Sequence, residues 1–152
     1  MSRTKFFDNI TKYFDFFETL FILALSVSLL LLTKTVAYSQ YAVYASLGCL
    51  TLLYWLMAIR PFEKKVAGIR IAIRRIVFVA YLLSCLAILA SLKFDYEVNP
   101  KPLITASLAF LGVAAVLLLV KKYKMKEPEK ITANLLRCVI FAVILVWLLF
   151  MF

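Results

Sequence analysis

The side chains able to do acid–base, metal or nucleophilic chemistry are few in this sequence. The chain has no histidine, so it lacks the commonest general base and the commonest ligand of catalytic metals. No acidic residue stands inside a long apolar run, where a proton relay or a coupled-ion site would need one. We therefore predict a non-catalytic protein with no metal site and no cofactor. The eight acidic residues lie in polar stretches or at the ends of apolar runs: Asp8, Asp15, Glu18, Glu63, Asp95, Glu97, Glu127 and Glu129.

Serine and cysteine, the remaining nucleophiles, have no catalytic partners. Such a nucleophile needs an adjacent base, and the chain offers no His–acid pair to supply one. The cysteines Cys49, Cys85 and Cys138 lie far apart, each within an apolar run, without the paired spacing of a zinc site. We interpret them as small buried side chains. The serines of the apolar runs are interpreted as helix-contact hydroxyls: Ser26, Ser28, Ser84 and Ser107.

Long apolar segments are the elements that must position any site in this chain. Of the 152 residues, 65% are hydrophobic, against roughly 45–50% in an ordinary soluble domain. A soluble globule of this size could not bury such an excess, so the pattern requires lipid as the solvent. In lipid the backbone must be paired within each segment, and about 20 helical residues cover the hydrocarbon core. We predict an all-α fold, a single polytopic transmembrane helical bundle with five spans: 19–36, 41–59, 76–92, 103–120 and 131–152.

Residues 1–18 precede the first predicted span and combine charge with aromatic side chains. Apolar residues recur there at spacings of three and four, with charged residues between them. On a helix this spacing makes one aromatic face and one charged face. We predict an N-terminal amphipathic interfacial helix in the headgroup plane. The alternative is a helix packed on a protein partner.

Proline residues mark several ends of the predicted spans. Pro61 follows the second span, and Asn99-Pro100-Lys101-Pro102 is the strongest turn signal in the chain. Pro128 suits the first turn of the last helix, where the missing N–H is harmless. Arg137 lies six residues into the last predicted span, at a depth that is costly for a charge at mid-bilayer. The last segment is therefore either a fifth full span or a half-span.

The distribution of Lys and Arg predicts how the bundle is oriented. The N-terminal segment holds three cations, residues 60–75 hold six and residues 121–137 hold six. Alternation through five spans puts all of these on one face, and leaves Lys34, Lys93 and Lys101 on the other. The positive-inside tendency then places the N-terminus in the cytoplasm, with a bacterial inner (plasma) membrane as the expected location.

The same cations are expected to contact anionic lipid headgroups. They lie in short stretches between apolar runs, a pattern that favours a leaflet surface over nucleic acid, which requires a basic polar surface. We therefore predict no nucleic-acid partner. The residues predicted to contact anionic lipid are Lys64, Lys65, Arg70, Arg74, Arg75, Lys121, Lys122 and Lys124.

Small residues recur at helical spacing in two of the predicted spans. Such stripes let helix backbones approach closely, which is how helices associate in lipid. The pattern does not say whether the neighbouring helix belongs to the same chain. The predicted helix-packing residues are Ala42, Ala45 and Gly48 in the second span, and Ala106, Ala109, Gly112 and Ala115 in the fourth.

These observations lead to three functional hypotheses. The first is a small non-catalytic membrane subunit or accessory or assembly factor, whose partner is another membrane protein or a second copy of itself. The second is a small oligomeric transporter, channel or lipid-handling protein, which would need a polar interior. The third is a sensor whose basic connectors bind anionic lipid.

Overall fold

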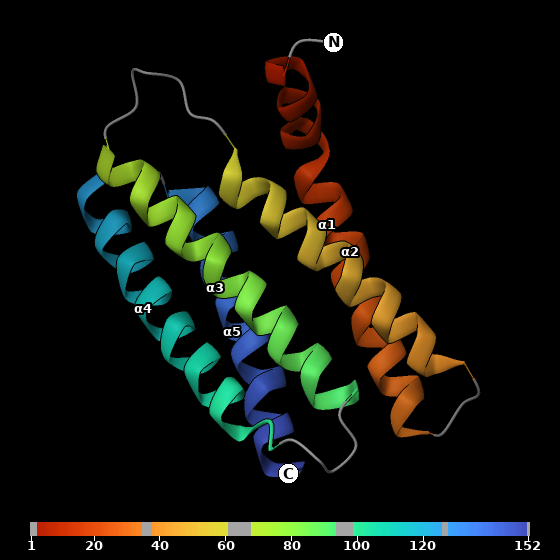
Figure 1. Cartoon of the computed structure of the whole chain (residues 1–152). Helices are drawn as coiled ribbons and strands as arrows, with labels where there is room; N and C mark the ends of the chain where they lie inside the picture. The colour runs from red at the N-terminus through yellow and green to blue at the C-terminus, as the bar shows by residue number, and fades with distance from the viewer. Residues whose placement is uncertain (1–2, 35–37, 61–67, 94–98, 126–127, 152) are drawn as a thin grey trace.

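The computed structural model describes residues 3–34, 38–60, 68–93, 99–125 and 128–151, and these form an all-α fold. Within them the chain makes five helices, each long and apolar enough to cross a membrane (Figure 1). The helices are α1 (Arg3–Thr33), α2 (Ser39–Ile59), α3 (Gly68–Lys93), α4 (Lys101–Met125) and α5 (Pro128–Met151).

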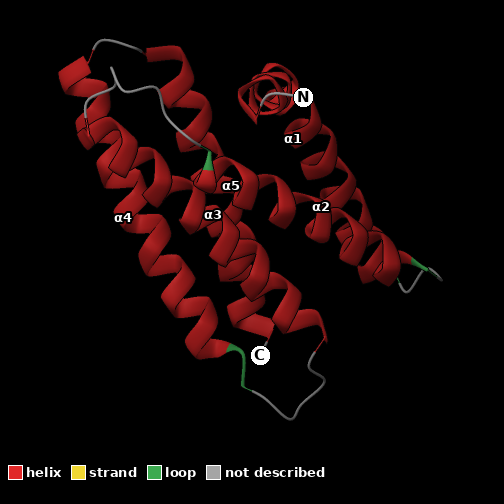
Figure 2. Ribbon diagram, turned by 45° about the horizontal axis from the view of Figure 1, so that its top comes forward, coloured by secondary structure: helices red, strands yellow, loops and turns green. Residues whose placement is uncertain are grey.

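The helices run up and down in chain order, and each packs on the next. In addition α5 returns to pack on α3, so that α3 and α5 lie between the α1–α2 pair and α4 (Figures 1 and 2). Among the described residues α1 and α5 do not pack backbone to backbone. We call the end of the bundle where α1, α3 and α5 begin and where α2 and α4 end the basic end (Figure 1). The candidate site lies at this end.

The helices are longer than predicted at the basic end. The predicted interfacial helix over residues 1–18 is not a separate element, because α1 is continuous from Arg3 to Thr33. Similarly α3 begins at Gly68, eight residues before the predicted start of the third span at residue 76. Residues 3–18 contain no proline or glycine that would interrupt a helix, and the extension of α3 contains three arginines, which are good helix formers, so each helix continues where the apolar run stops. The last segment is one helix over its full length, as a full span requires.

Local sequence accounts for two of the helix ends. Arg60 has an extended backbone, φ −52° and ψ 129°, as expected for a residue that precedes proline. The side-chain Oδ1 of Asn99 accepts a hydrogen bond from the backbone N–H of Lys101 at 3.1 Å and so begins α4. The helix therefore begins inside the predicted turn at residues 99–102, with Lys101 and Pro102 already helical.

Aromatic rings fill the core in the half of the bundle nearest the basic end. Tyr54 of α2 and Tyr81 of α3 are fully buried, with ring centroids 5.2 Å apart. Phe141 of α5 stacks on Tyr81 at 5.7 Å, and Phe78 of α3 lies 6.2 Å from the same ring. This aromatic cluster joins α2, α3 and α5 and forms the base on which the site rests.

Serine hydroxyls inside the helices are paired with backbone carbonyls, as burial away from water requires. Ser84 of α3, which is fully buried, donates to the carbonyl of Ala80 in its own helix at 2.8 Å. Ser107 of α4 donates to its own helix and also, at 3.2 Å, to the carbonyl of Leu83 in α3. The prediction of a helix-contact hydroxyl is confirmed for Ser107.

Candidate functional site

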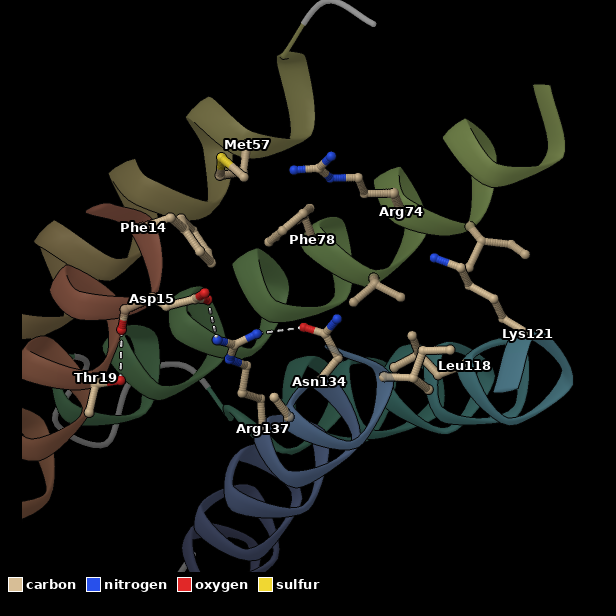
Figure 3. A pocket seen from close by; sticks show the side chains of 14 residues that line it. Phe14, Asp15, Thr19, Met57, Arg74, Phe78, Leu118, Lys121, Asn134 and Arg137 are labelled. Carbon is tan, nitrogen blue, oxygen red and sulfur yellow. Dashed lines mark hydrogen bonds and ion pairs between the residues drawn. The ribbon is translucent and has the colours of Figure 1, made fainter. Parts of the chain in front are cut away.

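A cavity of about 700 Å³ lies at the basic end, and all five helices contribute to its lining. Figure 3 shows its polar side chains: Asp15 and Thr19 of α1, Arg74 of α3, Lys121 of α4, and Asn134 and Arg137 of α5. Apolar side chains line the rest of it, including Met57, Val77, Leu118 and Ile131. The cavity therefore combines a charged part with an apolar part.

Arg137 makes the central ion pairs of the site. Its Nη2 contacts Oε2 of Glu18 and lies 3.0 Å from Oδ1 of Asp15, and both acids belong to α1. Its Nη1 donates to Oδ1 of Asn134 at 2.6 Å within α5. Since α1 and α5 do not pack directly, the side chain of Arg137 spans the space between them.

Glu18 is the buried member of this cluster, with 1% of its side chain exposed. Its second oxygen, Oε1, accepts a hydrogen bond from the hydroxyl of Tyr54 at 2.9 Å. Asp15, by contrast, is 83% exposed at the edge of the cavity. The carboxylate that neutralises Arg137 away from water is therefore Glu18, while Asp15 marks the open side.

Glu18 stands at the end of an apolar run, as the sequence indicates, but its burial was not predicted. The structure places Glu18 within a continuous helix and buries it, because α2 covers it and the facing helix supplies Arg137. Sequence reasoning missed this pair, although a signal was present. Both residues stand near the start of a span on the same predicted side, and they carry opposite charge.

Two arginines flank a pair of aromatic rings beside the cavity. The guanidinium of Arg137 lies 5.8 Å from the ring centre of Phe14, and that of Arg74 lies 5.6 Å from the ring centre of Phe78. The two rings meet edge to face at 5.6 Å. Cation–π contacts of this kind are favourable, especially away from water. The aromatic pair thus orients both arginines and stands between their charges.

The residues predicted to contact anionic lipid are divided by the structure. Arg74 and Lys121 line the cavity and are half-buried, whereas Arg70, Arg75 and Lys122 are exposed. Three further positions give no structural outcome: Lys64 and Lys65 lie outside the described residues, and the side chain of Lys124 also lies outside them.

The predicted helix-packing residues lie on the outside of the bundle, with one exception. Ala115 is half-buried against the core. A Cβ atom added at Gly48 or Gly112 would meet no neighbouring atom within 4 Å. The small residues on the outside therefore remain accessible to a helix of another chain. The exposed members are Ala42, Ala45, Gly48, Ala106, Ala109 and Gly112.

The cysteines divide in the same way. Cys85 and Cys138 are buried, as predicted, but Cys49 is exposed on the outer face of α2, so the prediction of burial is wrong for it. The reason is that an outward position on a membrane helix suits an apolar side chain as well as an inward one. Cys138 also approaches the hydroxyl of Tyr81, at 3.6 Å. Among the described residues no group of His, Cys, Asp and Glu could hold a metal ion.

Comparison with known proteins gives no relative: the chain matches no protein family, no curated protein and no solved structure.

Proposed function

We propose that this chain is a multi-pass membrane protein of a bacterial inner (plasma) membrane, with its basic end and N-terminus at the cytoplasmic face. The excess of Lys and Arg in the segments at that end supports this orientation. At 31 residues, α1 has a length of about 46 Å, which exceeds a hydrocarbon core of about 30 Å. Its first turns are proposed to extend through the headgroup region. Reporter fusions that place the two basic connectors on opposite faces would contradict this arrangement.

We further propose that the protein is non-catalytic and handles a membrane lipid, by holding an amphiphile in the cavity at the basic end. The observation that carries this proposal is the lining of the cavity, in which charged and apolar side chains from the same helices lie side by side. Its apolar side chains match a hydrocarbon chain, and its charged side chains match a polar headgroup. An amphiphile satisfies both parts.

The test is whether an added bulky side chain in the cavity displaces bound lipid. Ala133 is exposed on α5 and lines the cavity, while Leu136 is exposed on the same helix and does not line it. We expect Ala133→Trp to lower lipid binding at least tenfold, an effect of about 1.4 kcal/mol. The matched control Leu136→Trp is expected to bind as the unmodified chain does.

Native mass spectrometry of the full chain, released from nanodiscs that contain neutral and anionic lipid, measures the bound lipid. The count includes lipids of either charge. Detection of no bound lipid on the unmodified chain would contradict the proposed function, as would equal loss of lipid in the two tryptophan variants.

A second candidate function is a subunit or accessory factor that associates with another membrane protein or with itself. A specific observation favours it: the small-residue stripes of α2 and α4 face outward, where a helix of another chain has access. This proposal concerns the outer surface of the bundle, and it is compatible with lipid in the cavity.

Leucine substitutions on the stripes test this candidate. Gly48→Leu and Gly112→Leu leave the fold intact, because both positions are open and Leu favours a helix over Gly by roughly 0.5–1 kcal/mol. We expect each to shift migration in blue-native electrophoresis from a complex towards the single chain. Val143→Leu, at an exposed position of α5, is the control. A lone monomer in native membranes would argue against this candidate.

A further inference from the structure

We propose that the cavity opens sideways into the bilayer between α1 and α5, and that the ion pair of Asp15 with Arg137 controls passage through this opening. The inference rests on the proposed lipid-handling function and concerns how the lipid enters. Three residues that line the cavity are exposed: Asp15 and Thr19 of α1, and Ala133 of α5. The lining residues of α2, α3 and α4 are buried or half-buried. The open side of the cavity therefore lies between α1 and α5.

The packing of the helices leaves this side open. Both α1 and α5 line the cavity, yet among the described residues they do not pack backbone to backbone. Instead α1 packs on α2, while α5 packs on α3 and α4. A lipid that passes through the α1–α5 opening therefore separates no pair of packed helices.

The ion pair of Asp15 with Arg137 crosses the opening. Figure 3 shows Asp15 of α1 pointing towards Arg137 of α5, with Thr19 beside it, and the paired atoms are 3.0 Å apart. Asp15 is 83% exposed, so this pair is easily broken. The buried carboxylate of Glu18 continues to hold Arg137 when Asp15 moves away. The pair can therefore open without loss of the contact between α1 and α5.

The surface around the opening suits lipid and not water. The opening lies near the start of two apolar stretches, Lys12–Leu32 of α1 and Ile131–Phe150 of α5. Exposed apolar side chains flank it on both helices: Phe16 and Leu23 on α1, and Leu136 on α5. In the membrane proposed above such side chains contact lipid chains. Entry from the bilayer is the route that this surface favours.

A thiol placed at the opening tests the route. Thr19→Cys is labelled with pyrene maleimide, a bulky reagent. Phe17→Cys is the matched control, because Phe17 is exposed on α1 but faces away from Thr19 and does not line the cavity. Both variants also carry Cys49→Ala, since Cys49 is the exposed cysteine and the other two are buried. Mass spectrometry confirms equal labelling.

The order of labelling distinguishes an opening from the binding site itself. A label added to the delipidated Thr19→Cys chain should slow uptake of lipid about tenfold, and a label added to the loaded chain should slow release about tenfold. A label that occupied the binding site would instead expel lipid from the loaded chain. Labelled Phe17→Cys is expected to keep both rates within about twofold.

The measurement uses the full chain in detergent micelles. The probe is an equal mixture of dioleoylphosphatidylglycerol and dioleoylphosphatidylcholine, offered to the delipidated chain to follow uptake. Release is followed by exchange of the bound lipid for the deuterated forms. Native mass spectrometry records the mass of the bound lipid over time.

Neutralisation of Asp15 tests control by the ion pair. We expect Asp15→Asn to raise the rates of uptake and release equally, by about two- to fivefold, the range for one exposed ion pair. The affinity should stay within about twofold, because a lower barrier speeds both directions alike. Asp15→Glu keeps the charge and is expected to keep the rates.

Several outcomes would overturn the inference, and they separate it from the proposed function. Unchanged uptake and release after labelling of Thr19→Cys would contradict the α1–α5 opening, while the cavity remains a lipid site. Expulsion of lipid by the label would put Thr19 in the binding site and not at its entrance. Unchanged rates in Asp15→Asn, or a lower affinity, would contradict control by the ion pair. Absence of any bound lipid contradicts the proposed function itself.

Discussion

Replacement of Arg137 by alanine is expected to destabilise the folded chain by about 3–5 kcal/mol, the usual effect of removing one partner from a buried ion pair. The substitution leaves the carboxylate of Glu18, 1% exposed, with the hydroxyl of Tyr54 as its remaining described partner. It also removes the side chain that spans α1 and α5. The loss of unfolding free energy is measured on the purified protein in mixed micelles. Circular dichroism follows unfolding as the mole fraction of SDS in the micelles is raised.

Two further variants show whether burial of the charge is the cause. Asp15→Ala removes an exposed carboxylate and is expected to cost less than about 1 kcal/mol. The double substitution of Glu18→Gln with Arg137→Gln leaves no buried charge and should cost clearly less than Arg137→Ala. A cost for Asp15→Ala equal to that of Arg137→Ala would contradict the account of the pair.

Replacement of Tyr81 by alanine is expected to cost about 3 kcal/mol. Its ring contacts those of Tyr54, Phe78 and Phe141, so the substitution opens a cavity at the junction of three helices. Loss of a buried aromatic ring costs about 3–5 kcal/mol in soluble cores. The lower end applies to the membrane protein proposed above, because helices in lipid associate through packing and not through exclusion from water. The same unfolding measurement tests the value.

The hydroxyl of Tyr81 is expected to contribute less than its ring. It donates to the backbone carbonyl of Asn134 at 2.7 Å, so Tyr81→Phe should cost about 1–2 kcal/mol. Trp147→Ala, on the partly exposed outer face of α5, is the control and should cost less than about 1 kcal/mol. A Trp147→Ala cost similar to that of Tyr81→Ala would indicate that the aromatic cluster is not the core of the fold.

The number and order of the helices could be predicted from sequence, because an apolar run of span length has one stable backbone conformation in lipid. The helix starts could not. Hydropathy reports where side chains become apolar, whereas the backbone of α1 and α3 stays helical through charged residues beyond that point. The Asn-Pro signal before α4 was located correctly, because it acts through local backbone chemistry.

The site was only partly predictable. Arg74 and Lys121 were singled out as cations, but nothing local to either residue says that they share a cavity while Arg70 and Lys122 lie outside it. That distinction depends on the rotation of α3 and α4 about their axes, which packing determines. The burial of Glu18 could not be predicted for a similar reason, since its partner Arg137 lies near the other end of the chain.

The ion pair that joins the first and last helices also bears on biogenesis. Asp15 and Arg137 are separated by 122 residues, so ribosomes at about 5–20 residues per second make α1 roughly ten seconds before its counter-ion exists. In the proposed membrane setting, water, a headgroup or an insertion factor must solvate the carboxylate of Glu18 during that interval. Synthesis of α5 ends this requirement, because it supplies Arg137 as the partner of Glu18. A quality-control system that recognises an unpaired acid in a nascent membrane helix would therefore recognise chains that stop short of α5.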